Sequence, residues 1–187
     1  NRRETRREND RTCRESGRSL RAFAASGYDR PMFTPTPIGV ARTPFAETRA
    51  IPKGPGAKHD AIGTLEIFEA FAIGLTDIEG FSHLYLLWEF DRAGGFDLLA
   101  TPPIDTRPHG VFATRSPRRP NPIALTVVEL LRRDGRILEV RGVDMLDGTP
   151  ILDIKPYLSS VPDTALRRGW ISEAEARQPQ VSSHEPK

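Results

Sequence analysis

The chain has 187 residues, of which 37% are hydrophobic, and a formal net charge of +2, which together allow one folded domain with a real core. Its single cysteine, Cys13, excludes a disulfide framework and is typical of proteins in the reducing cytosol. No apolar run approaches the roughly 20 residues of a membrane span, and the start of the sequence lacks the apolar segment of a signal peptide. We therefore expect a cytoplasmic protein with no membrane partner.

The basic residues are concentrated near the N-terminus. Residues 1–21 contain eight arginines and four acidic residues, a local net charge of +4, so the rest of the chain sums to −2. Because residues 1–31 lack an apolar face, we expect them to form a disordered or marginally helical arm. The folded domain is expected over residues 32–165, and residues 166–187 are expected to form a short helix and a disordered tail. If the domain binds nucleic acid, it needs a local basic patch.

The pattern of the domain is that of a β protein. Short apolar or alternating runs, separated by Gly and Pro clusters, predict strands at residues 38–42, 62–68, 83–90, 123–131, 136–143 and 151–155. The run at 83–90, HLYLLWEF, is almost continuously apolar and therefore predicts a strand buried on both faces. Asp134-Gly135 predicts a hairpin turn between two of the strands.

The last predicted strand carries polar residues among its apolar ones. Side chains alternate between the two faces of a strand, which places Leu152 and Ile154 on one face. The same alternation places Ile151, Asp153 and Lys155 together on the other face. An ion pair between Asp153 and Lys155 is then expected at the surface.

Helical signals are few in this sequence. Ser172-x-x-Glu175 has capping-box spacing and predicts a short helix that Pro179 stops. Six or more short strands with turn signals and little helix predict an all-β barrel or sandwich. The Gly54-x-Gly56 pair does not indicate a Rossmann fold, because no strand precedes it and no helix pattern follows it.

Residues 110–125, GVFATRSPRRPNPIAL, are the most distinctive stretch. The apolar residues 111–113 predict a strand that leads into a loop, and three prolines within six residues leave that loop few conformations. No acidic residue lies between residues 107 and 121 to neutralise its three guanidinium groups, which suit phosphate or carboxylate: Arg115, Arg118 and Arg119. A solvated connector is the alternative, but such a connector has no need of this stiffness. We therefore favour a functional loop.

An acidic cluster surrounds the Gly-Thr-Pro turn before the last strand. Asp147-Gly148 is explained by turn chemistry, and Asp144 and Asp153 lie close to it in sequence. Alternatively, the turn amides and carboxylates recognise the amine, hydroxyls or base of a ligand, and the two interpretations remain open. A magnesium phosphohydrolase is not indicated, because no His partner or phosphate-binding loop lies nearby.

The histidines carry no recognisable catalytic or metal motif. Ser82 and His83 are adjacent in a predicted strand and point to opposite faces, so they are not a nucleophile and its base. We interpret His83 as a hydrogen-bonded structural residue. The four histidines are far apart in sequence and have no cysteine companions in the domain, so we assign no metal ligands.

Five segments together resemble one known family. The sequence resembles the TsaA family, also called TrmO or VirR-like, over residues 33–163, in the content, order and spacing of these segments: PIGVARTPF (37–45), IPKG (51–54), GFSHLYLLWEFD (80–91), GVFATRSPRRPNPIAL (110–125) and DMLDGTPILDIKPY (144–157).

The resemblance implies a small single-domain β-barrel with short helices and long loops that binds S-adenosylmethionine without a Rossmann fold. It also implies a homodimer and tRNA (adenine-N6) methylation of N6-threonylcarbamoyladenosine next to the anticodon, so the expected partner is a tRNA anticodon stem-loop. Cofactor contacts carried over by motif are Pro52, Lys53, Gly54, Phe90, Asp91, Arg115, Leu125, Asp147, Gly148, Thr149 and Pro150. Bacterial members often have Pro-Arg-Gln and Phe-His where this chain has Pro-Lys-Gly and Phe-Asp, which places it in a divergent branch.

Methyl transfer from a sulfonium to a nitrogen needs no nucleophilic side chain, which agrees with the missing triad. The nitrogen must lose a proton, for which we consider Asp147, Asp144 and Asp153 as acceptors. We expect RNA contacts from four residues: Arg118, Arg119, Lys155 and Tyr157. The alternatives are a methyltransferase of the same fold with another substrate, or a non-catalytic S-adenosylmethionine- or RNA-binding regulatory module.

Overall fold

The computed structural model describes residues 34–52, 60–158 and 168–177. The chain divides into two units, residues 1–35 and 36–187, and nearly all of the described residues belong to the second. The expected N-terminal arm and C-terminal tail lie outside the described residues. The elements, with η for a 3-10 helix, are β1 (Gly39–Arg42), η1 (Thr48–Ala50), β2 (Ile62–Ile67), η2 (Glu69–Leu75), η3 (Ile78–Gly80), β3 (His83–Glu89), β4 (Leu99–Ala100), β5 (His109–Gly110), η4 (Val111–Ala113), β6 (Ile123–Asp134), β7 (Ile137–Arg141), β8 (Pro150–Pro156) and α2 (Trp170–Arg177).

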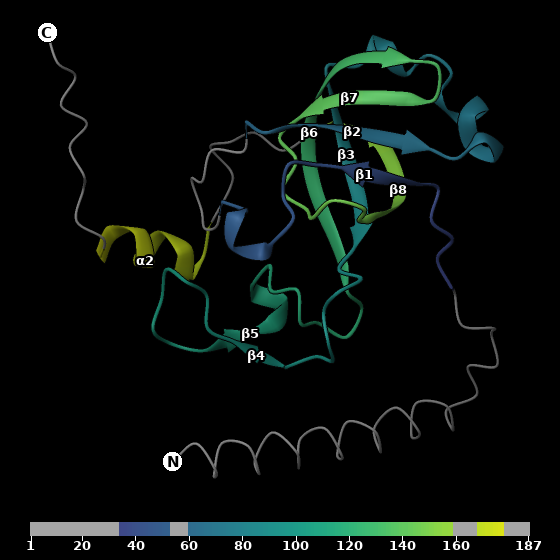
Figure 1. The fold of residues 1–187 in the computed structure, drawn as a ribbon. Helices are drawn as coiled ribbons and strands as arrows, with labels where there is room; N and C mark the ends of the chain where they lie inside the picture. The colour runs from purple at the N-terminus through teal and green to yellow at the C-terminus, as the bar shows by residue number, and fades with distance from the viewer. Residues whose placement is uncertain (1–33, 53–59, 159–167, 178–187) are drawn as a thin grey trace, which may run out of the picture. The chain divides into compact units, whose positions relative to one another are not determined.

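Six strands form a closed antiparallel barrel in the order β1-β2-β7-β6-β3-β8 (Figure 1). β8 closes the ring by pairing with both β3 and β1. Closure pairs the edges that an open sheet would expose to other chains. The all-β barrel expected from the sequence is confirmed.

The barrel interior is an apolar core, and β3 shows how one strand contributes to it. Leu84, Leu86 and Trp88 are buried, whereas the residues between them are partly exposed. The prediction that this strand is buried on both faces was wrong. A strand of a closed antiparallel barrel has only one face toward the interior, so its outward apolar residues remain at the surface.

β8 contains an irregularity that the alternating pattern did not predict. Ile154 pairs with Leu86 and Ile151 pairs with Trp88, so two residues of β8 face the single residue Leu87. Ile151 is fully buried and Ile154 packs against the core. The bulge therefore puts Ile151 on the inner face, opposite to the predicted one. The expected Asp153–Lys155 ion pair is confirmed on the outer face, with 2.7 Å between Nζ and Oδ2.

The hairpin between β6 and β7 follows its sequence signal. Asp134 pairs with Ile137, and Gly135 has a positive φ of 57°. A two-residue turn with a left-handed glycine matches the twist of the flanking strands. The predicted hairpin is confirmed.

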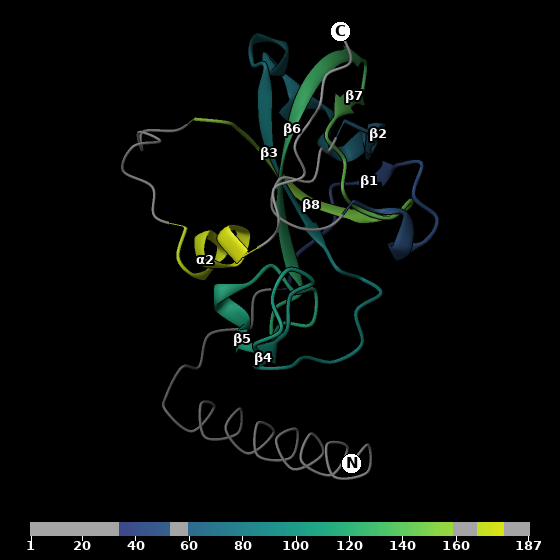
Figure 2. The same ribbon diagram turned by 90° about the vertical axis from the view of Figure 1, so that its left-hand side faces the viewer.

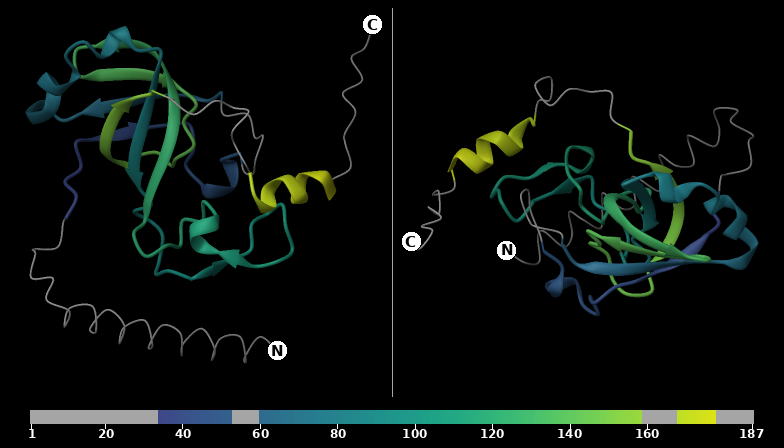
Figure 3. Two further views of the ribbon diagram at one scale, coloured as in Figure 1. Left: turned by 180° about the vertical axis from the view of Figure 1, so that it is seen from behind. Right: turned by 90° about the horizontal axis from the view of Figure 1, so that it is seen from above.

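Residues 90–122 connect β3 to β6 and lie beyond one end of the barrel (Figures 2 and 3). Within them β4 pairs with β5, and the predicted strand at 111–113 is instead the 3-10 helix η4. Thr114 donates from both its N–H and its hydroxyl to the Val111 carbonyl, at 3.1 and 2.9 Å. These two bonds turn the chain directly after β5, so the strand ends at Gly110.

The helix α2 begins at Trp170, two residues before the predicted start. Its existence is confirmed, while Pro179 lies outside the described residues. The Trp170 indole donates to the Ala113 carbonyl at 2.9 Å, and its ring stacks on His109 with 4.1 Å between centroids. These contacts attach α2 to the segment that carries Arg115, Arg118 and Arg119, which we call the arginine loop.

Candidate functional site

A cleft of about 330 Å³ lies where β3 ends and β8 begins, a size within the usual range for small-molecule pockets. Four segments that are distant in sequence line it: η1 with Ile51, the end of β3 with its following loop, residues 117–118, and the turn before β8. Five residues of the predicted site are in its walls: Phe90, Asp91, Arg118, Asp144 and Thr149. We call this hollow the Asp144 cleft.

A buried chain of hydrogen bonds leads to the Asp144 cleft from the barrel interior. The Trp88 indole donates to the Thr126 hydroxyl at 3.0 Å, and that hydroxyl donates to Asp144 Oδ1 at 2.6 Å. Thr126 is the inward-facing partner of Leu86 across the β3–β6 ladder. Sequence reasoning missed Thr126 and Trp88. The signal was a single hydroxyl residue in the apolar run IALTVVELL.

The turn before β8 is held by the loop after β1. The Thr43 N–H donates to Asp147 Oδ1 at 3.1 Å, and the Asp147 N–H donates to the Phe45 carbonyl at 2.9 Å. Gly148 adopts the left-handed region, with φ 77°. Arg92, which sequence reasoning also missed, donates to the Asp147 carbonyl at 2.6 Å. The Asp147 carboxylate therefore stabilises the turn and does not line the Asp144 cleft.

Each arginine of the arginine loop donates to a carboxylate or a carbonyl group. Arg118 donates to Asp97 Oδ2 at 2.5 Å and to the Gly94 carbonyl at 2.7 Å. The hydrogen bond and the charge of Asp97 raise the pKa of the Arg118 guanidinium. Arg115 donates to the Leu125 carbonyl, and Arg119 to the Thr114 carbonyl at 3.3 Å. The expectation of an un-neutralised loop fails for Arg118, because an acid 21 residues away in sequence reaches it in space.

The remaining predicted residues that the structure describes do not line the Asp144 cleft. Leu125, Asp153 and Lys155 lie on the outer face of the sheet formed by β6, β3 and β8. Tyr157 follows β8 and packs its ring against Tyr85, with 5.0 Å between centroids. Pro150 begins β8 beside Thr149, and Pro52 follows the cleft residue Ile51. Lys53 and Gly54 lie outside the described residues.

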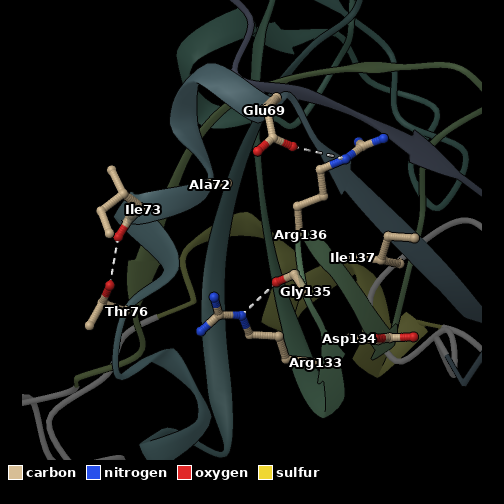
Figure 4. Close-up of a pocket in the computed structure, with 9 residues that line it drawn as sticks. All are labelled: Glu69, Ala72, Ile73, Thr76, Arg133, Asp134, Gly135, Arg136 and Ile137. Carbon is tan, nitrogen blue, oxygen red and sulfur yellow. Dashed lines mark hydrogen bonds and ion pairs between the residues drawn. The ribbon is translucent and has the colours of Figure 1, made fainter.

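A larger hollow, about 720 Å³, lies beside the β6–β7 hairpin and η2 (Figure 4). Its polar groups bond to one another. Arg133 donates to the Gly135 carbonyl at 2.7 Å and to Glu79 at 2.9 Å, and Arg136 lies 3.6 Å from Glu69. None of the predicted site residues within the described segments lines it. We therefore take the smaller Asp144 cleft as the candidate site.

A second carboxylate, Asp105, lies in the segment before β5 and contacts Arg177 of α2, and only 3% of its side chain is exposed. Its Oδ2 accepts from Arg177 at 2.9 Å and lies 3.3 Å from His109 Nε2, while its Oδ1 accepts from the Thr106 and Arg107 N–H groups. Desolvation alone would raise the pKa of this carboxyl. The hydrogen bonds from Arg107, His109 and Thr106, with the Arg177 charge, outweigh it and hold the pKa well below its usual range.

Two further properties of the described residues bear on function. Within residues 34–52, 60–158 and 168–177, no three His, Cys, Asp or Glu side chains gather closely enough to hold a metal ion. In the same segments, no helix combines the length and the apolar character needed to cross a bilayer.

Comparison with known proteins places this chain in a family. Residues 40–163 match the model of the tRNA-methyltransferase O N-terminal domain. A probable S-adenosyl-L-methionine-binding protein of Pyrococcus abyssi is 49% identical over 139 residues, which are 72% of this chain and 74% of that protein. A tRNA (adenine(37)-N6)-methyltransferase of Escherichia coli is 40% identical over 141 residues, 68% of this chain and 60% of that protein.

A solved structure agrees with these matches. The crystal structure of TrmO from Pseudomonas aeruginosa superposes with a TM-score of 0.60 at 38% identity, covering 74% of this chain and 62% of that one. The chain thus spans less than two thirds of the length of the E. coli and P. aeruginosa proteins. The family match, the identities and the shared barrel confirm the resemblance seen in the sequence: the chain belongs to the tRNA-methyltransferase O N-terminal domain family.

Proposed function

We propose that this chain is an S-adenosylmethionine-dependent methyltransferase that acts on N6 of threonylcarbamoyladenosine next to the anticodon of tRNA. One observation carries the proposal. The Asp144 cleft brings Phe90 and Asp91 of one motif segment and Thr149 of another into one hollow of ligand size beside the arginine loop. The name of the E. coli relative, a tRNA (adenine(37)-N6)-methyltransferase, supports the choice of reaction.

The walls of the cleft fit a nucleoside cofactor. Trp88 and Phe90 meet edge to face, with 4.6 Å between centroids, and offer an aromatic surface to a base. Asp144 offers a carboxylate, and no hydrogen bond to its Oδ2 is found among the described residues. Residues proposed to hold the cofactor or to support its site are Pro52, Lys53, Gly54, Phe90, Asp91, Arg115, Leu125, Asp147, Gly148, Thr149 and Pro150. When bound, the cofactor supplies a methyl group on a sulfonium, which leaves as a thioether.

The role of the protein is to position the partners and to accept a proton. The target nitrogen gains the methyl group and loses one proton. Of the three candidate acceptors, Asp144 lines the cleft, whereas Asp147 bonds to Thr43 and Asp153 pairs with Lys155 on the outer face. We therefore assign the proton to Asp144 Oδ2.

RNA binding is proposed for the arginine loop and the outer face near β8. Arg119 and Lys155 contact phosphates of the anticodon stem-loop, and the exposed Tyr157 stacks a base. Arg118 is paired with Asp97 and Lys155 with Asp153, so the contribution of each requires a phosphate to replace its carboxylate partner. Phosphate contacts make the affinity for tRNA fall with salt.

We also propose a homodimer that uses the outer face of β6. Ile123, Leu125 and Val127 alternate along this strand, and each is more than 40% exposed. Contiguous exposed apolar side chains are typical of protein interfaces. Light scattering coupled to size exclusion tests the proposal: Leu125→Lys should convert a dimer to a monomer, and a monomeric wild type would refute it.

The main test is mass spectrometry of nucleosides from tRNA incubated with the protein and with cofactor that carries a deuterated methyl group. A labelled methyl group on threonylcarbamoyladenosine supports the proposal. The P. abyssi relative is named only for binding, which favours a second candidate, a non-catalytic S-adenosylmethionine-binding or RNA-binding regulatory module. Cofactor binding without tRNA methylation would favour that module or a methyltransferase with another substrate.

A further inference from the structure

The direction of the hydrogen bonds that reach Asp144 is determined by their chemistry. An indole N–H only donates, so the Thr126 oxygen accepts from Trp88 at 3.0 Å. A hydroxyl has a single proton to donate, and the second hydrogen-bond partner of the Thr126 hydroxyl is the carboxylate oxygen Asp144 Oδ1 at 2.6 Å. That proton therefore points to Asp144 Oδ1, and the short distance is typical of a hydroxyl bonded to an ionised carboxylate.

The position of Thr126 makes this hydroxyl costly unless it is bonded. Its neighbours on the inner face of β6, Ala124 and Val128, are buried and apolar, and Thr126 itself is 6% exposed. A buried hydroxyl without partners costs free energy, and valine would fill the same volume without a polar group. Because both bonds of Thr126 are made, the hydroxyl is locked in orientation and so is the carboxylate oxygen that it contacts.

We propose that Thr126 is a positioning residue for Asp144: its hydroxyl holds Oδ1, so that Oδ2 is turned to the cleft and accepts the proton of the methyl-acceptor nitrogen. Trp88 also contributes, because its N–H donates to the Thr126 hydroxyl and so leaves that hydroxyl to donate its own proton to Asp144 Oδ1. This inference rests on the proposed function for its chemical consequence, but the Trp88–Thr126–Asp144 coupling is a property of the protein alone.

Nuclear magnetic resonance of the full chain tests the coupling without any reaction. The sequence has two tryptophans, Trp88 and Trp170, so a ¹⁵N-labelled sample gives two indole signals that Trp170→Phe assigns. Made alone, Asp144→Asn should change the chemical shift of the Trp88 indole signal. Made in a Thr126→Val background, the same substitution should leave that chemical shift unchanged. A signal that moves equally in both backgrounds, or in neither, would overturn the proposal.

Kinetics of methyl transfer to tRNA test whether the position of Asp144, held by Thr126, affects the reaction. Thr126→Val should lower kcat about tenfold, the equivalent of one lost hydrogen bond, and leave KM for tRNA within about twofold. Thr126→Ser keeps the hydroxyl and should retain the wild-type kcat. In an Asp144→Asn background, Thr126→Val should cause no further loss, because residues that act through one another are not additive.

A purely structural role predicts other results. In that case Thr126→Ser fails to restore kcat, or the losses from Thr126→Val and Asp144→Asn multiply, and either outcome rejects the positioning role. Val128→Ala, a buried position two residues further along β6, controls for general loss of stability. If the wild type transfers no methyl group to tRNA, the proposed function fails, and the indole signals still decide the coupling.

Discussion

Asp144 and Asp105 are both carboxylates held by hydrogen bonds, but they differ in whether an oxygen is left to bind a ligand. Asp105 is 3% exposed and accepts from backbone N–H groups on Oδ1 and from side-chain donors on Oδ2. Asp144 lines a cleft, and among the described residues only its Oδ1 is bonded. A carboxylate saturated with donors fastens elements together, whereas a carboxylate held by one oxygen can meet a ligand with the other.

Replacement of the available carboxylate should have the largest effect. Asp144→Asn removes the proton acceptor but keeps the size of the side chain, and loss of a general base typically lowers kcat by about 100-fold or more. Methyl transfer to tRNA, measured with labelled cofactor, checks this. Asp153→Asn, on the outer face beside Lys155, is the matched control and should stay within about twofold of wild type.

Replacement of the saturated carboxylate should instead loosen one part of the fold. Asp105→Ala leaves Arg177 and His109 without their shared acceptor. Hydrogen exchange of the α2 amides should accelerate by about tenfold or more, because charged hydrogen bonds to a buried group are lost. Exchange in β3 and β6 of the barrel should not change. Unaltered protection in α2 would show that Asp105 does not fasten the helix.

The contacts of Asp105 should be lost only at low pH, because its carboxyl has a lowered pKa. The folded-state pKa of Asp105 lies below its unfolded value of about 3.9, so the carboxylate favours the folded state fully above that value. This stabilisation is lost as the pH falls below about 4 and through the folded-state pKa. Trp170 fluorescence, measured in a Trp88→Phe variant, should therefore stay constant from pH 7 to about pH 5. A transition between pH 7 and about pH 5 would refute the assignment of these contacts to the Asp105 carboxylate.

The same contrast between saturated and available groups applies to two neighbouring arginines and predicts the smallest effect. Arg118 is paired with Asp97, whereas the one hydrogen bond that Arg119 donates among the described residues goes to the Thr114 carbonyl at 3.3 Å. Arg119→Ala should weaken tRNA binding a few-fold and reduce the salt slope by about 1, as expected for one lost phosphate contact. Arg118→Ala should have a smaller effect on both the affinity for tRNA and the salt slope. Equal slopes for the two variants, measured by fluorescence anisotropy, would remove the distinction.

Only some residues of the candidate site could be predicted from the sequence. Phe90, Asp91, Asp144 and Thr149 could be named from motifs, and the structure places them around one cleft. Thr126 could not be named, because a lone threonine in an apolar strand gives no sign of which side chains will surround it. The pairing of Arg118 with Asp97 was equally invisible, since it depends on where a loop returns in space.

By itself, the sequence determined the β class, the hairpin at Asp134-Gly135 and the short helix near residue 172. These features depend on the sterics and hydrogen bonds of near neighbours, which a local pattern records. Only the tertiary structure decided the bulge that turns Ile151 inward and the path from Trp88 through Thr126 to Asp144. Each of these depends on the register of strands around a closed barrel, which is set by packing between residues far apart in sequence.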